Sequence, residues 1–130
     1  MKGIMEIFKY CKVREVKSPS RGTNVAAGID FYIPTDITPE TWTEKCNSTK
    51  CHPVTMFNNN KTVDSIILAP GDSVLIPSGI KMKVPNGHAM VMMNKSGVGS
   101  KKQLSVLACV IDEDYQGEVH LNIANVGKDT

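Results

Sequence analysis

Residues 79–93 read GIKMKVPNGHAMVMM, and this stretch decides the fold class. Apolar residues alternate with lysines over 80–84, as they do in a strand that buries one face, whereas no helical period fits. A Pro-Asn-Gly turn follows at 85–87, and an apolar run continues over 89–93. The pattern predicts a β-hairpin with one buried face.

Strand and turn signals continue on both sides of this hairpin. Residues 74–76 form a short apolar run between two Gly-containing turns, and residues 7–16 are typical of an edge strand. One short helix is expected over 38–46, with Thr38 as its N-cap and a proline at its first position. Many short strands separated by turns are typical of a sandwich, a barrel or a jelly roll. We therefore expect a single mostly β domain over residues 1–130.

Residues 39–65 do not follow this pattern of short strands and turns. They are polar, rich in Asn, Thr and Lys, and contain the only Trp of the chain, so we interpret them as a long insertion loop at the surface. Cys46, Cys51 and His52 lie within this segment, but a structural metal site needs about four ligands at suitable spacing. A solvated loop is therefore expected there rather than a metal site.

Composition and charge exclude several classes of protein. The apolar share of 41% and the charged share of 22% are ordinary for a globular domain, and no apolar run approaches the roughly 20 residues of a membrane span. The first residues do not resemble a signal peptide, so we expect a cytoplasmic protein whose cysteines are free thiols. A net charge of +2 is too small to indicate nucleic-acid binding. The expected ligand is a small molecule, with neither a membrane nor a nucleic acid as partner.

Three Gly-containing clusters carry residues suited to chemistry. In the first, AAGIDFYIP, Asp30 either satisfies a turn at the end of a strand or lies near a metal ion. In the second, NKSGVGSKKQL, the residues Lys95, Ser96 and Gly97 either form an ordinary turn or hold phosphate oxygens. Each of these clusters is a weak signal when it is taken alone.

The third cluster, VIDEDYQGEV at 110–119, is the most unusual of the three. If it is a strand, Asp112 and Asp114 share one face, and like charges side by side are unfavourable unless a cation or a polar ligand accompanies them. One interpretation is a solvated face, with Tyr115 covering the core. The other is a general base beside an aromatic platform for a sugar or a base.

Taken together and in this order, the clusters resemble the first three motifs of the homotrimeric dUTP diphosphatases, or dUTPases. The resemblance runs through AGID, PGDSVLIPSGIKMKVPNG, NKSGVGSKKQL and VIDEDYQGEVHLNIANVG, which cover most of the chain outside residues 38–64. It implies a mostly β subunit with a distorted jelly-roll or β-clip fold, in a homotrimer whose active sites are shared between subunits. The implied enzyme hydrolyses dUTP to dUMP and diphosphate and depends on Mg²⁺.

The resemblance also implies roles for residues of the third cluster. Asp112 matches the carboxylate that activates the water attacking the α-phosphorus, and Tyr115 matches the ring that packs on deoxyribose and excludes a 2′-hydroxyl. The backbone of residues 105–111, with Cys109, Val110 and Ile111 as the expected contacts, matches the segment that reads uracil. A carbonyl there accepts from the ring N3–H while amides donate to the ring oxygens, a pattern that cytosine cannot meet.

The remaining implied roles concern phosphate and metal. Lys95, Ser96 and Gly97 match a phosphate-contacting loop that faces the active site of a neighbouring subunit. Asp30 matches a carboxylate near Mg²⁺ and its waters. The triphosphate holds most of that ion's coordination sphere, so no direct protein ligand is expected.

The chain departs from the family pattern in three ways. Lys95 stands where the family most often has Arg, which would give bidentate contacts to phosphate. Leu107 and Cys109 stand where Gly is common in the uracil-reading segment. The family pattern continues beyond Thr130 into a fourth and a fifth motif, so we expect these 130 residues alone to be weakly active.

Two other functions stay open. A dCTP deaminase shares the early motifs, but it places a catalytic Glu where this chain has Asn122 and typically a Trp or Phe where this chain has Tyr115. A non-catalytic nucleotide-binding or regulatory module could use the same scaffold, with residues 39–65 serving a protein partner. Asp112 separates the possibilities, because an enzyme needs that carboxylate and a scaffold does not.

Overall fold

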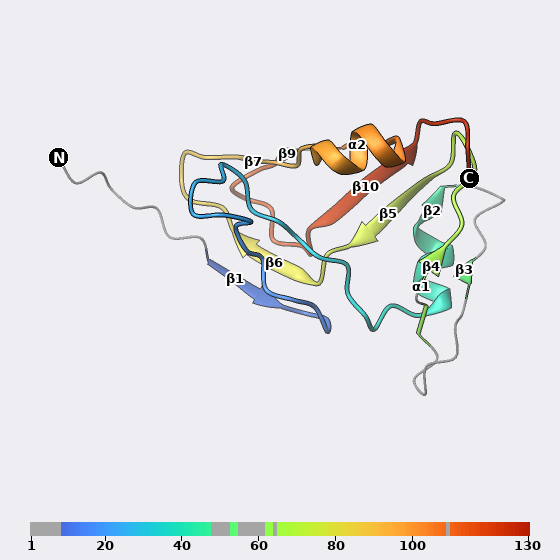
Figure 1. Ribbon diagram of the computed structural model, residues 1–130. Helices are drawn as coiled ribbons and strands as arrows, with labels where there is room; N and C mark the ends of the chain where they lie inside the picture. Colours follow the sequence, from blue (N-terminus) through green and yellow to red (C-terminus); the bar gives the residue numbers. More distant parts are fainter. Residues whose placement is uncertain (1–8, 48–52, 55–61, 64, 109) are drawn as a thin grey trace.

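The computed structural model describes residues 9–47, 53–54, 62–63, 65–108 and 110–130 (Figure 1). Its elements in chain order are β1 (Lys9–Lys12), α1 (Pro39–Lys45), β2 (Cys46–Asn47), β3 (Pro53–Val54), β4 (Ser65–Ile66), β5 (Ser73–Pro77), β6 (Ile80–Lys83), β7 (Met90–Val91), α2 (Ser96–Lys102), β8 (Leu104–Val106), β9 (Val110–Ile111) and β10 (His120–Asn125). The paired strands of these named elements all run antiparallel. The mostly β prediction is therefore confirmed.

The largest sheet has the strand order β2-β5-β10-β8. Its central pair is β5 and β10, in which Val74 lies opposite Ile123. The strand predicted at 74–76 is thus β5, and it runs between the two Gly-containing turns that the sequence indicates. Gly79 in the second turn has φ +73°, and a Cβ there would lie 2.8 Å from Val16 Cγ1. Only glycine fits that turn without strain.

The predicted hairpin over 80–93 is wrong in its pairing. The turn forms as expected, with Gly87 at φ +75° and His88 N donating to Pro85 O at 3.1 Å. However, β6 pairs with the edge strand β1, and β7 pairs with β9 (Figure 1). Alternation in a sequence tells which face a strand buries, but the choice of partner depends on residues distant along the chain. The two arms therefore enter separate two-stranded sheets.

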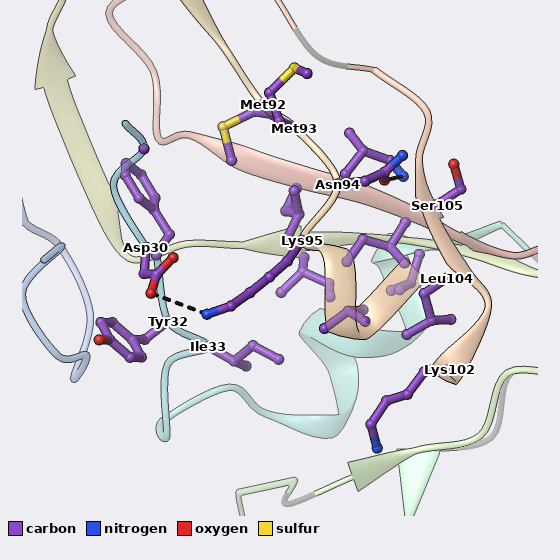
Figure 2. A pocket seen from close by; sticks show the side chains of 18 of the residues that line it. Asp30, Tyr32, Ile33, Met92, Met93, Asn94, Lys95, Lys102, Leu104 and Ser105 are labelled. Carbon is purple, nitrogen blue, oxygen red and sulfur yellow. Dashed lines mark hydrogen bonds and ion pairs between the residues drawn. The ribbon is translucent and has the colours of Figure 1, made fainter. Parts of the chain in front are cut away.

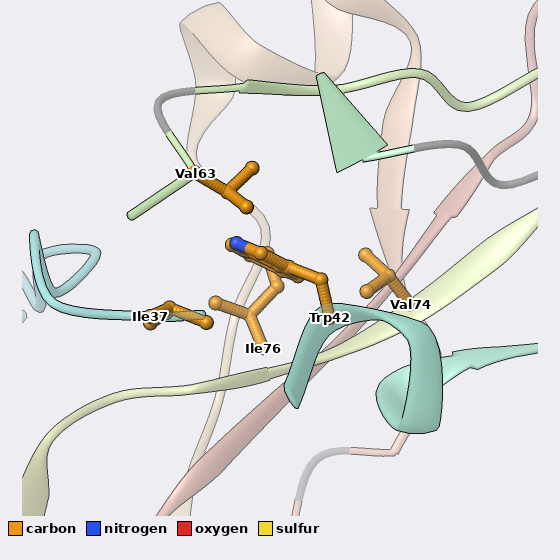
Figure 3. Packing of buried hydrophobic residues seen from close by; sticks show 5 residues of the cluster. All are labelled: Ile37, Trp42, Val63, Val74 and Ile76. Carbon is orange, nitrogen blue, oxygen red and sulfur yellow. The ribbon is translucent and has the colours of Figure 1, made fainter. Parts of the chain in front are cut away.

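The insertion predicted at 39–65 is not simply a surface loop. Trp42 is 4% exposed and Val63 is 6% exposed, and both belong to the core cluster drawn in Figure 3. The cluster is completed by Ile37 and by Val74 and Ile76 of β5. A polar composition concealed two apolar side chains that anchor the segment to the main sheet.

The short helix of this segment forms as predicted. α1 begins at Pro39, and the Thr38 hydroxyl accepts from Thr41 N at 3.3 Å, which caps the first turn. The chain then continues directly into β2, which pairs with the edge of β5. This arrangement explains how Trp42 reaches the sheet.

A second core cluster lies beneath β6 and β9. It contains Ile80, Met82, Val84, Ile111 and Val119, each no more than 9% exposed. Three of them are the alternating apolar residues of the opening stretch, so the predicted buried face is confirmed. The cluster also holds the residues that flank the acidic stretch 112–118.

The expectation of free cysteines is wrong for Cys46, which is disulfide-bonded. Its partner lies outside the described residues. Cys11 is a free, exposed thiol. The expectation rested on the absence of a secretory signal, which bears on the cellular compartment and not on which sulfurs the fold brings together. None of the described helices is long and apolar enough to cross a membrane.

Candidate active site

Asp112 and Tyr115 line one cleft, which we call the acidic cleft. Its volume is about 560 Å³. Its lining is formed by Leu75, Met92, Ala108, Val110, Ile111, Asp112, Asp114, Tyr115, Gln116, Gly117, Val119 and His120. The structure thus brings the predicted base, the predicted sugar-contacting ring and two of the predicted uracil-reading residues to one place.

The acidic residues stand on a turn rather than on a strand. β9 ends at Ile111, and Tyr115 N donates to Asp112 O at 3.2 Å, which closes the turn. The prediction that Asp112 and Asp114 share a strand face is therefore wrong, although both line the acidic cleft. Ile111 is buried and fixes the start of the turn. The exposed Asp112 carboxylate makes no hydrogen bond or ion pair with any described residue, so it is available to water or a ligand.

Tyr115 forms a wall of the acidic cleft instead of covering the core. The side chain is 43% exposed, and its hydroxyl donates to Glu118 O at 2.7 Å. The ring lies over Gly117, where an added Cβ would lie 2.6 Å from the Tyr115 hydroxyl oxygen. The Tyr115 ring can therefore occupy this position only because residue 117 has no side chain.

Glu113, which lies between the two aspartates of the turn, has a hydrogen-bond partner in the structure. Its Oε2 accepts from Gly87 N at 2.7 Å. This bond ties the acidic turn to the turn between β6 and β7. The sequence carries no signal for it, because the two residues lie 26 positions apart.

Glu118 is a second residue that the sequence does not single out. Its Oε2 lies 2.8 Å from Arg14 Nε and its Oε1 lies 3.2 Å from Arg14 Nη2. The two residues lie 104 positions apart, so their pairing is visible only in the fold. The pair connects the end of the acidic stretch with the segment that follows β1.

A second and larger cleft, which we call the lysine cleft, has a volume of about 2190 Å³ and includes Asp30, Lys95 and Ser96 in its lining. Lys95 Nζ lies 3.1 Å from Asp30 Oδ2, and Figure 2 shows the long side chain reaching across to the carboxylate. The backbone of Asp30 also pairs with Ser20. The backbone of Asp30 thus serves local structure, while its carboxylate pairs with Lys95 in the lining of the cleft.

The predicted phosphate loop is in fact the start of a helix. Lys95 is the N-cap of α2, which contains Ser96 and Gly97 in its first turn and ends at Lys102, with Gln103 as its C-cap at φ +53°. Glycines disfavour helices, so the sequence indicated a loop. Gly97 is not among the residues that line the lysine cleft.

The predicted site residues therefore fall into two clefts of the same chain. Asp112 and Tyr115 line the acidic cleft, while Asp30 and Lys95 line the lysine cleft, and Met92 contributes to both. Within the described residues there is no group of three side chains suited to a metal ion. Of the residues expected at uracil, Cys109 lies outside the described residues.

The chain is similar to known proteins over this part of the sequence. The family model described as dUTPase matches residues 61–130. The deoxyuridine 5′-triphosphate nucleotidohydrolase of Shigella sonnei (strain Ss046) is 37% identical over 70 residues, which are 52% of this chain and 46% of the relative. The enzyme of the same name from Escherichia coli (strain K12 / DH10B) is 36% identical over the same shares. The chain thus spans about half the length of the curated relatives that it matches.

Solved structures extend the similarity to most of the fold. A mutant dUTPase from phage phi11 of Staphylococcus aureus, described with a structural Mg(II) ion, matches with a TM-score of 0.63 and 20% identity over 93% of this chain and 61% of that chain. A mutant dUTPase of Staphylococcus bacteriophage 80alpha with dUpNHpp matches with a TM-score of 0.65 and 19% identity over 95% and 57% of the two chains. The expected fold class is confirmed by these likenesses.

Proposed function

Because the chain belongs to the dUTPase family, we propose that the protein hydrolyses dUTP to dUMP and diphosphate. The observation that carries this proposal is the acidic cleft, where the Tyr115 ring lines the same space as the Asp112 carboxylate, which pairs with no residue that the structure describes. Its volume of about 560 Å³ is in the range of small-molecule sites. The names of the curated relatives support the choice of substrate.

In this proposal Asp112 acts as the general base. Its exposed carboxylate accepts a proton from a water molecule, whose oxygen attacks the α-phosphorus. The bond from the α-phosphorus to the bridging oxygen breaks, and that oxygen leaves as part of diphosphate. Positioning and charge stabilisation supply most of the catalysis in phosphoryl-type transfers, so the fixed turn beneath Asp112 is as important as its basicity.

Substrate selection follows from the walls of the acidic cleft. Tyr115 packs on the deoxyribose, and the backbone around Val110 and Ile111 reads the uracil. Leu107 N already donates to Asn122 O at 2.9 Å, so it is not free to bind a base. The Leu107 side chain is 54% exposed. The amides that bind uracil are therefore those after residue 107.

We infer that Mg²⁺ accompanies the triphosphate. This ion takes most of its ligands from phosphate oxygens and waters, and Asp30, which lines the lysine cleft, offers a carboxylate suited to bind such waters. Asp30 would accept from metal-bound waters after Lys95 moves to the phosphates. When it is bound, Mg²⁺ neutralises the charge that develops on the phosphate oxygens.

We also infer a homotrimer with shared active sites, acting in the cytoplasm. The separation of Lys95 and Asp112 into two clefts supports this inference, since one chain then supplies the base and a neighbouring chain supplies the phosphate contact. Exposed apolar residues that line one or the other of the two clefts also support it, because a partner would cover them. These residues are Val91 (50% exposed), Met93 (77% exposed) and Val110 (61% exposed).

A substrate panel tests the proposed function. The full natural chain is incubated with Mg²⁺ and dUTP, dCTP, dTTP or UTP, and diphosphate and ammonia are measured. We expect diphosphate and dUMP from dUTP, with much slower release from the other three. Ammonia from dCTP would identify a deaminase instead. Binding of the dUTP analogue dUpNHpp without turnover of any of the four would identify a regulatory module.

A further inference from the structure

Both oxygens of the Glu118 carboxylate make hydrogen bonds within the fold. Arg14 contacts Oε2 through Nε at 2.8 Å and Oε1 through Nη2 at 3.2 Å. Gly79 N also donates to Oε2 at 2.9 Å. The side chains of Arg14 and Glu118 are only 26% and 13% exposed. A bidentate pair that is largely screened from water has a defined geometry, unlike most surface ion pairs.

The backbone of the same residue holds Tyr115. The carbonyl of Glu118 accepts from the Tyr115 hydroxyl at 2.7 Å, and His120 Nδ1 lies 2.8 Å from the same oxygen. The next residue, Val119, is 1% exposed and donates its N–H to Ile80 O at 2.9 Å. The peptide group between Glu118 and Val119 is therefore held at its C=O, which accepts from the Tyr115 hydroxyl, and at its N–H, which donates to Ile80 O.

We propose that Glu118, held by Arg14, is a positioning residue that fixes the Tyr115 ring in the acidic cleft and thereby sets the preference for deoxyribose over ribose. This inference rests on the proposed function. A ring excludes a 2′-hydroxyl only if it cannot retreat, and a side chain that is 43% exposed has room to rotate. The hydrogen bond from its hydroxyl to Glu118 O at 2.7 Å limits that freedom, because any rotation of the ring away from this position would break it.

Three variants of the full natural chain test the proposal through sugar selectivity. Selectivity is the ratio of kcat/KM for dUTP to kcat/KM for UTP. Arg14→Met removes the ion pair and keeps the aliphatic stem, and Tyr115→Phe removes the hydroxyl and keeps the ring. We expect Arg14→Met and Tyr115→Phe each to lower the selectivity about threefold to tenfold, which is the range for the loss of one hydrogen bond. Arg14→Lys keeps the charge and should restore part of the loss.

The double variant Arg14→Met/Tyr115→Phe separates positioning from general destabilisation. If Arg14 acts through the Tyr115 hydroxyl, the double variant should have the selectivity of Tyr115→Phe alone. Multiplicative losses would overturn the proposal. Ile37→Val, in the other core cluster, is the control that lowers the melting temperature and should leave selectivity unchanged.

A second readout does not depend on activity. In protein with ¹³C-labelled tyrosines, of which the chain has three, the ring signals of Tyr115 should shift and broaden in Arg14→Met but not in Ile37→Val. Unchanged Tyr115 signals in Arg14→Met would overturn the positioning claim. If the wild type hydrolyses no nucleotide, the proposed function and the selectivity claim fail, while the NMR comparison still decides whether Arg14 positions Tyr115.

Discussion

Lys95 Nζ lies 3.1 Å from Asp30 Oδ2, and this pair joins two clusters that are 65 residues apart in the sequence. The side chains are 67% and 35% exposed, respectively. Exposed pairs of this kind contribute at most about 1 kcal/mol to stability. Little free energy is therefore lost when Lys95 leaves Asp30 to bind a triphosphate. This fits a lysine that contacts phosphate only when substrate is bound.

Replacing Lys95 should weaken the use of dUTP. Lys95→Met removes a charge-assisted contact and should lower kcat/KM for dUTP about 10- to 100-fold, whereas Lys95→Arg keeps the charge and should stay within a few-fold of the wild type. Steady-state kinetics with dUTP measures both variants. Equal activity of Lys95→Met and the wild type would show that Lys95 does not contact the substrate.

Replacing Asp112 should affect turnover and not binding. Asp112→Asn removes the base and should lower kcat about 100- to 10 000-fold, while the affinity for dUpNHpp changes little. Asp114→Asn is the matched control, because Asp114 lies on the same turn and lines the same cleft. Single-turnover hydrolysis and calorimetric titration give the two quantities. Equal losses in the two variants would show that charge in the cleft, rather than one base, supports hydrolysis.

The packing of Trp42 gives a prediction on stability. Trp42→Ala leaves a cavity in the core cluster of Figure 3 and should lower the free energy of unfolding by about 3–5 kcal/mol. Trp42→Phe should lower it less, since the buried Nε1 has no hydrogen-bond partner among the described residues to lose. Denaturant titration measures both. A loss near zero for Trp42→Ala would contradict a core role for α1.

Gly71 and Gly79 both have positive φ, so replacing each by Ala separates the cost of backbone strain from the cost of a steric clash. Gly71 has φ +85° with no atom within 4 Å of an added Cβ, while Gly79 has φ +73° with Val16 Cγ1 at 2.8 Å. Gly71→Ala should destabilise the fold by about 1 kcal/mol from backbone strain alone. Gly79→Ala should cost about 1–3 kcal/mol more, because Val16 must also move. Similar melting temperatures of the two variants would contradict the close approach.

The local features of the fold could be predicted from the sequence. The alternation over 80–84 identified a buried face, the turn residues identified Gly79 and Gly87, and Thr38 identified a helix start. These features depend on neighbours within a few positions, which a sequence displays directly. The same holds for Val110 and Ile111, which lie beside Asp112 in one cleft because they adjoin it in the chain.

Features that depend on distant residues were missed. The partner of β6 is β1 and not β7, and the ion pair of Arg14 with Glu118 spans 104 positions. α2 forms although Gly97 and Gly99 disfavour helices, because intrinsic helix propensity is only a weak guide to local structure. The predicted site likewise divided into two clefts, since alternation and motif order carry no information on which surfaces meet.

Complementation between two inactive variants tests the central claim most directly, namely that one chain supplies Asp112 and another supplies Lys95 to the same active site. Asp112→Asn and Lys95→Met are co-expressed in equal amounts and assayed for diphosphate release from dUTP, with each variant alone as the control. We predict recovery to about a quarter of the wild-type activity, because random assembly joins an intact Asp112 to an intact Lys95 with that chance. Activity no higher than that of the separate variants would contradict a shared site.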